Sequence, residues 1–218
     1  MVNILLDYCN IDHPWLYDEL KNYIQSHHKV VIIAFSKAKS VAEWELLYGK
    51  KNGKHYDKIV GGFTVYGIPE ENVAFVNYFA DTKDTALNKI KDADIVYFPG
   101  GMPDRMMERI QEFELQDAIM AHKGVVMGYS AGALIQLAEY HISPDEDYPE
   151  FKYCEGLPFL KDFYLEVHYD ENATEQNLAI KKVLEERRKT VYATSFSQGA
   201  ILVDNGTVKL LGDVKVYK

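Results

Sequence analysis

The sequence from Val125 to Ile135 reads Val-Val-Met-Gly-Tyr-Ser-Ala-Gly-Ala-Leu-Ile. The apolar run Val125–Met127 is typical of a buried strand, and the residues after Gly132 are typical of a helix. Gly128 and Gly132 flank Ser130, a pattern in which small residues let a strand and the following helix approach closely. A serine at such a turn takes a strained backbone conformation and projects its hydroxyl above the edge of a sheet. The segment therefore predicts a parallel strand, a sharp turn at Ser130 and a helix.

Short apolar runs rich in β-branched residues alternate with longer mixed segments along the rest of the chain. Strands are predicted at 3–6, 30–35, 74–78, 95–98, 125–128, 190–194 and 200–203, and helices at 15–25, 82–91, 102–110, 113–122, 131–140 and 175–189. This alternation is typical of βαβ units around a mainly parallel sheet with helices on both faces. Two apolar runs flank Asn205-Gly206, a strong signal for a β-hairpin. We therefore expect a doubly wound α/β fold, formed by residues 1–218 as one domain, with a C-terminal β-hairpin.

The composition limits the classes of protein to which the chain can belong. A formal net charge of −9 over 218 residues gives no overall attraction to nucleic acid or to an anionic membrane. The cysteines, Cys9 and Cys154, lack the spacing of a disulfide framework or a zinc site. No segment approaches the roughly 20 apolar residues of a membrane span, and the first residues do not resemble a signal peptide. We expect a cytoplasmic monomer or homodimer without a metal or organic cofactor.

A second glycine-rich turn, Phe98-Pro99-Gly100-Gly101, follows another predicted strand and leads into another predicted helix. The carboxyl ends of neighbouring parallel strands face one crevice, where open α/β sheets bind ligands. The backbone N–H groups of Gly101 and Ala131 would then both be available to an oxyanion near Ser130. A plain tight turn between a strand and a helix is the alternative explanation of these glycines.

An activated serine needs a base, and the chain contains seven histidines. His168 differs from the others because residues 165–169 are typical of a strand end that runs into a polar loop. An imidazole at such a position can point into a cleft. Ser130 and His168 are therefore the candidate nucleophile and general base. The alternative is a serine that caps a helix and a histidine that is merely exposed.

These segments resemble peptidase E, a family of aspartyl dipeptidases related to the cyanophycinases, with the class I glutamine amidotransferase-like (flavodoxin-like) fold. The resemblance extends in order along most of the chain and rests on residues 98–101, 128–133, 167–169 and 199–203. It implies an elbow serine, a histidine as general base and an acidic residue that orients the histidine. Ser130 and His168 match the first two of these roles.

The third catalytic position departs from the family pattern. In relatives the acid lies just before the glycine that corresponds to Gly199, and here that position is Gln198. A neutral amide can accept a hydrogen bond from an imidazole but cannot stabilise an imidazolium by charge. Asp145, in the acidic and aperiodic loop 143–150, is the alternative acid. Glu166, close to His168 in sequence, is interpreted as part of a solvated acidic rim.

The resemblance implies a serine-type peptidase that hydrolyses small peptides through an acyl-enzyme on Ser130. It also implies a preference for an N-terminal aspartyl residue, which would require a cationic pocket for the β-carboxylate. Arg105, Arg187 and Arg188 are candidates for that pocket. Gln198 suggests the alternative of a non-catalytic or regulatory relative on the same scaffold.

Two other enzyme classes fit the sequence less well. An α/β-hydrolase esterase has the order serine, acid, histidine, with the histidine late in the chain. Here His168 is the last histidine and follows Ser130 by only 38 residues, which leaves little room for the sheet of that fold. A glutamine amidotransferase would need a cysteine at position 130.

Overall fold

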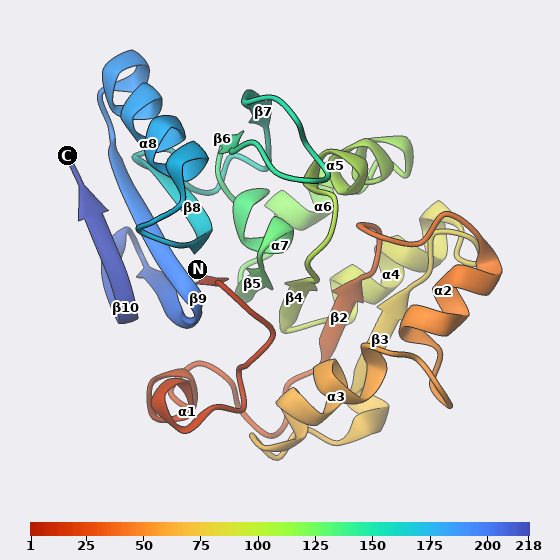
Figure 1. The fold of residues 1–218 in the computed structure, drawn as a ribbon. Coiled ribbons are helices and arrows are strands. Elements are labelled where there is room, and N and C mark those ends of the chain that lie inside the picture. Colours follow the sequence, from red (N-terminus) through yellow and green to blue (C-terminus); the bar gives the residue numbers. More distant parts are fainter.

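The computed structural model describes all 218 residues and places an eight-stranded sheet at the centre of the molecule (Figure 1). Its parallel part lies in the spatial order β1-β5-β4-β2-β3 and comprises β1 (Val2–Leu6), β2 (Val30–Ile33), β3 (Val73–Val76), β4 (Ile95–Phe98) and β5 (Val125–Tyr129). Most residues of these strands are buried, as expected for parallel strands covered on both faces. The mainly parallel α/β sheet predicted from the apolar runs is confirmed.

The other strands extend the sheet beyond β1. The 15-residue strand β9 (Thr190–Asp204) pairs with β1 in antiparallel fashion through its second half and with β8 (Phe163–Tyr169) in parallel fashion through its first half. β10 (Thr207–Tyr217) pairs with β9 as the predicted C-terminal hairpin. Asn205 and Gly206 both have positive φ, 47° and 83°, which is the conformation of a type I′ turn.

Helices cover both faces of the sheet (Figure 1). They are α1 (Pro14–Leu20), α2 (Val41–Tyr48), α3 (Tyr56–Thr64), α4 (Lys83–Asp92), α5 (Pro103–Glu112), α6 (Gln116–Met120), α7 (Ala131–Leu134) and α8 (Thr174–Arg187), with a 3₁₀ turn at Glu70–Asn72. Neighbouring side chains of a strand point to opposite faces of the sheet. Ile4 therefore lies in the buried cluster to which α1, α2 and α3 contribute, and Leu5 lies in the cluster on the other face, to which α4 to α7 contribute. None of these helices is long and apolar enough to span a bilayer.

The structure differs from the predicted elements after the turn at Ser130. The helix predicted at 131–140 ends at Leu134, and β6 (Glu139–Ile142) forms a hairpin with β7 (Lys152–Glu155). The backbone carbonyls of Ile135 and Gln136 accept hydrogen bonds from Leu157 and Leu160, 2.7 and 3.1 Å long, instead of continuing the helix. This early end carries the loop 143–150 to the carboxyl edge of the sheet. Sequence periodicity also missed α2 and α3.

Candidate active site

Ser130 lies in a strained turn between β5 and α7. Its backbone has φ 52° and ψ −119°, a combination that residues other than glycine rarely adopt. The turn is held by hydrogen bonds from Ser130 N to the carbonyl of Leu6, 3.0 Å, and from Ala133 N to the carbonyl of Ser130, 2.9 Å. The side chain of Ser130 does not cap α7. Its hydroxyl is therefore free for another partner.

The glycines on either side of Ser130 allow a close approach between α7 and the sheet. A Cβ atom at Gly128 would lie 2.5 Å from the carbonyl oxygen of Gly132, and one at Gly132 would overlap the carbonyl oxygen of Phe98. Glycine is therefore required at both positions. Because β4 and β5 are parallel neighbours, the close approach also places the turn after Phe98 beside Ser130.

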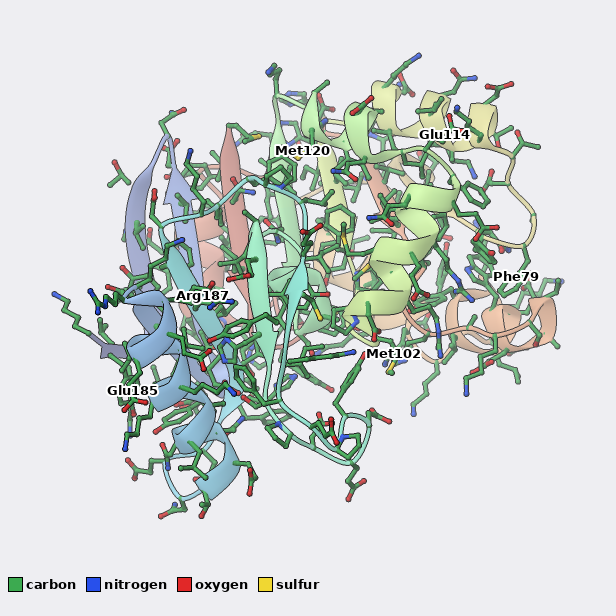
Figure 2. All side chains as sticks on the ribbon, turned by 90° about the horizontal axis from the view of Figure 1, so that it is seen from above. Phe79, Met102, Glu114, Met120, Glu185 and Arg187 are labelled. Carbon is green, nitrogen blue, oxygen red and sulfur yellow. The ribbon has the colours of Figure 1, made fainter.

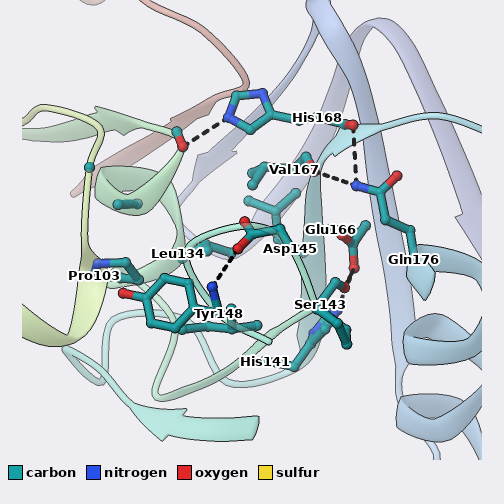
Figure 3. Close-up of a pocket in the computed structure, with 16 residues that line it drawn as sticks. Pro103, Leu134, His141, Ser143, Asp145, Tyr148, Glu166, Val167, His168 and Gln176 are labelled. Atoms are coloured by element: carbon teal, nitrogen blue, oxygen red, sulfur yellow. Dashed lines mark hydrogen bonds and ion pairs between the residues drawn. The ribbon is translucent and has the colours of Figure 1, made fainter. Parts of the chain in front are cut away.

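His168 is the partner of the Ser130 hydroxyl. The distance between His168 Nε2 and Ser130 Oγ is 2.9 Å (Figure 3). His168 has a positive φ of 55° near the end of β8, where the pairing register with β9 shifts between Glu166 and Tyr169. Irregularities of this kind change the direction of a side chain at a strand end. This one accompanies the approach of the imidazole to Ser130.

Asp7 is the partner on the other side of His168. Its Oδ2 lies 3.2 Å from His168 Nδ1, and its Oδ1 accepts a hydrogen bond of 2.6 Å from the backbone N–H of His168. The hydroxyl of Thr194 and the backbone N–H of Ser197 also donate to this carboxylate, at 3.0 and 2.8 Å. Asp7 is completely buried. Its position favours a proton on His168 Nδ1, which leaves Nε2 able to accept the proton of Ser130.

The structure places Asp7, and not Gln198 or Asp145, against the imidazole of His168. Gln198 lies in a separate hollow with His13 and Trp15. Asp145 Oδ1 accepts from the backbone N–H groups of Asp147 and Tyr148. Neither side chain forms a hydrogen bond with His168. Asp7 was missed because it precedes His168 by 161 residues. One signal was available, since Asp7 directly follows the first predicted strand, at the carboxyl edge where α/β sheets place functional groups.

Two backbone N–H groups lie beside Ser130 without an acceptor in the protein. They belong to Gly101 and Ala131, which line the same pocket. The buried hydroxyl of Ser36 donates to the carbonyl of Gly100 over 2.7 Å. In a trans peptide the carbonyl and the N–H point in opposite directions, so this bond directs the Gly101 N–H away from Ser36. The arrangement offers two donors to a negatively charged oxygen near Ser130.

A pocket of about 250 Å³ adjoins Ser130 and His168 (Figure 3). This volume is below the roughly 300–1,000 Å³ of sites for drug-sized ligands, so it suits a small group. The apolar part of its wall consists of Pro103, Ala131, Leu134, Ile142, Pro144, Leu165 and Val167. The polar side chains of the wall are those of Ser130, His141, Ser143, Asp145, Tyr148, Glu166, His168 and Gln176.

None of the three arginines considered for a carboxylate pocket lines this one. The guanidinium of Arg105 donates to the carbonyl of Lys37 over 2.9 Å. Arg187 forms an ion pair with Glu139, 2.7 Å long. It belongs to α8, which lies at one end of the molecule in Figure 2, with the labelled Phe79 at the other end. The pocket therefore lacks a lysine or arginine that could pair with a substrate carboxylate.

Comparisons with known proteins relate the chain to a peptidase family. Residues 61–211 match the sequence profile of Peptidase family S51. A Listeria monocytogenes EGD-e protein, provisionally described as a peptidase E, has a similar fold, with a TM-score of 0.68, 18% identity and coverage of 97% of this chain and 98% of that one. A peptidase from an acI-B1 actinobacterium is similar with a TM-score of 0.68, 17% identity and coverage of 99% and 89%. None of the curated proteins compared with the chain matches it.

Proposed function

Because this chain belongs to peptidase family S51, we propose that it is a serine-type peptidase that hydrolyses small peptides through an acyl-enzyme on Ser130. The observation that carries the proposal is the continuous series of contacts from Ser130 Oγ to His168 Nε2 and from His168 Nδ1 to the Asp7 carboxylate. Nucleophile, base and orienting acid in this relation are the arrangement of a serine hydrolase. The small pocket beside them supports a small peptide as substrate.

In the proposed reaction, His168 Nε2 takes the proton of the Ser130 hydroxyl while Oγ attacks the scissile carbonyl carbon. The negative charge that develops on the carbonyl oxygen is stabilised by the N–H groups of Gly101 and Ala131. The imidazolium, stabilised by the charge of Asp7, then gives its proton to the leaving amine, and the peptide bond breaks. A water molecule attacks the acyl-enzyme with His168 as base, which releases the acid and restores Ser130.

The position of Asp7 also weakens the alternative of a non-catalytic relative. That alternative rested on a neutral Gln198 at the third catalytic position. We assign the orienting role to Asp7, a buried carboxylate with four donors beside His168. The implied preference for an N-terminal aspartyl residue has less support, because no cationic side chain lines the pocket.

Two measurements test whether the reaction depends on Ser130: covalent labelling and substrate hydrolysis. The purified protein is incubated with a fluorophosphonate probe and with a panel of dipeptides and aminoacyl p-nitroanilides. We expect labelling and hydrolysis by the native chain and their loss in Ser130→Ala. Ser26→Ala is a matched control, because Ser26 is exposed and precedes β2 at the opposite edge of the sheet. Labelling or hydrolysis that survives in Ser130→Ala would contradict the proposal.

A further inference from the structure

Glu166 is a buried residue of the pocket wall and not part of a solvated rim. Only 5% of the residue is exposed. Its Oε2 atom lies 2.7 Å from His141 Nε2 and accepts a hydrogen bond of 2.6 Å from the Ser143 hydroxyl. The protein supplies no donor to the other oxygen, Oε1, and this atom is not enclosed by protein. Because Glu166 lines the pocket, Oε1 is available to a group that enters it.

The contacts of His141 indicate that its imidazole is not a cationic partner of Glu166. His141 is 2% exposed, and its imidazole stacks on Phe151 with an interplanar angle of 22°. Its Nδ1 atom is buried without a hydrogen-bond partner. An imidazolium would place an unpaired N–H donor and a positive charge at this position, which burial strongly disfavours. A neutral imidazole that donates from Nε2 satisfies the geometry and brings no positive charge to Glu166.

The acidic side chains of the pocket wall, Glu166 and Asp145, have no basic side chain other than histidine beside them in that wall. Asp145 is an exposed residue of the same wall, and only its Oδ1 atom is used by the backbone N–H groups of its own loop. The wall contains no lysine or arginine. A carboxylate brought next to buried Glu166 would be repelled in surroundings that screen charge poorly. A cationic group would find an unused oxygen of opposite charge.

We infer that this pocket binds a cationic group of the substrate against Glu166 and disfavours a carboxylate side chain. The inference rests on the proposed peptidase function, since the cation would belong to the residue whose carbonyl is attacked by Ser130. Its α-ammonium and a basic side chain offer the same chemistry. The pocket, at about 250 Å³, has room for one residue. The specificity assigned in this way differs from the aspartyl preference that the family resemblance implies.

Hydrolysis of matched anilides tests the inference. Lysyl, leucyl and aspartyl p-nitroanilides are compared, each with a free and with an acetylated amino group. We expect kcat/KM for the lysyl compound to exceed that for the aspartyl compound by at least about tenfold. If the α-ammonium is the bound cation, acetylation abolishes hydrolysis of all three. If the side chain is bound, acetyl-lysyl anilide remains a better substrate than acetyl-leucyl anilide.

Two variants of the pocket wall show whether Glu166 is responsible. In Glu166→Gln we expect the ratio of kcat/KM for lysyl over aspartyl anilide to fall by about tenfold, with Asp145→Asn, at an exposed position, giving a smaller fall. Circular dichroism checks that each variant is folded. If Glu166→Gln does not fold, the ratio in Asp145→Asn and its decrease with added salt remain as measurements of the same charge effect.

A binding measurement separates this inference from the proposed function. NMR titrations of Ser130→Ala with n-butylamine and with butyrate compare a cation and an anion of similar size without any turnover. Preferential binding of n-butylamine, lost in Ser130→Ala/Glu166→Gln, supports the inference even if no anilide is hydrolysed. Equal or tighter binding of butyrate, or serine-dependent hydrolysis that favours aspartyl anilide, overturns the inference and leaves the peptidase proposal standing. Absence of serine-dependent labelling and hydrolysis overturns the peptidase proposal alone.

Discussion

At the scale of single residues, the imidazole of His168 is held between groups that come from the carboxyl ends of two neighbouring strands. Ser130 follows β5, Asp7 follows β1, and these strands are parallel partners over five residue pairs. Asp7 in turn contacts the backbone of His168 and Ser197 and the hydroxyl of Thr194. The carboxylate thus has two functions that can be separated by substitution. It orients the imidazole, and it satisfies donors of two other strands.

Substitution of Asp7 tests the first function. In Asp7→Asn the side chain no longer stabilises an imidazolium by charge, and its amide can hold the wrong tautomer of His168. We expect kcat to fall on the order of 10³- to 10⁴-fold, with the change in KM small by comparison. Hydrolysis of the best anilide measures both constants. Gln198→Ala is the control, and a comparable fall in kcat for Gln198→Ala would place the orienting role there instead.

Ser36 is predicted to act on the reaction through the Gly100–Gly101 peptide. In Ser36→Ala the Gly100 carbonyl loses its buried donor, and the Gly101 N–H is no longer held in one direction. We expect kcat to fall by at least about tenfold, since loss of a complete oxyanion donor costs about 10²- to 10³-fold. Ser40→Ala is the matched control. Ser40 caps α2 through Glu43 N, so it should lower stability by about 1 kcal/mol without changing kcat.

At the scale of elements, the short helix α7 is placed by its contact with β4. The Phe98 carbonyl lies so close to Gly132 that no side chain fits between them. The same contact brings together the turns that carry Ser130 and Gly101. The loop 143–150 follows from the early end of α7, because β6 begins only five residues later. This is how Asp145 comes to the pocket without reaching His168.

Replacement of Gly132 should disturb this contact. A methyl group in Gly132→Ala would push α7 away from β4, so we expect the free energy of unfolding to fall by about 2 kcal/mol or more and hydrolysis to decrease. Gly61→Ala is the matched control, because Gly61 lies in α3 with open space around its Cβ position. There alanine should raise stability by roughly 0.5–1 kcal/mol. Urea denaturation measures both, and equal stability of the two variants would contradict the packing argument.

At the scale of the whole molecule, several histidines couple the fold to pH. Burial is the main cause that lowers the pKa of His28, His55 and His122 below 6.5. For His55 the pKa falls to about 4, because burial is reinforced by the charges of Lys37 and Lys54. Between these pH values the three histidines bind more protons in the unfolded chain than in the folded chain. Their contribution to stability is therefore fully present above pH 6.5 and is lost as the pH falls towards 4.

The contribution of His55 can be measured directly. In His55→Gln the fall in the free energy of unfolding between pH 7.5 and pH 4.5 should be smaller than in the native chain, because one group that takes up a proton on unfolding is removed. Urea denaturation at several pH values measures the slope. The exposed His27, changed to Gln, is the control. An unchanged slope in His55→Gln would contradict the lowered pKa of His55.

Local patterns along the chain were sufficient for several features. Apolar runs predicted β1, β4 and β5 to within a residue or two, and Asn205-Gly206 predicted the hairpin, because turn conformation and strand burial depend on neighbouring residues. Periodicity did not predict the early end of α7. Backbone N–H groups of residues 156–160 bind the carbonyls of the residues that follow α7, and this competition has no local signature.

The sequence by itself therefore determined the α/β class, the strained turn at Ser130 and the choice of His168 as its candidate partner. These follow from the residues that flank each position. Only the tertiary structure brought Asp7 to His168 and buried Glu166 in the pocket wall. Both contacts join strands that are distant in the chain, and the order of strands in the sheet decides which carboxylates meet which histidines.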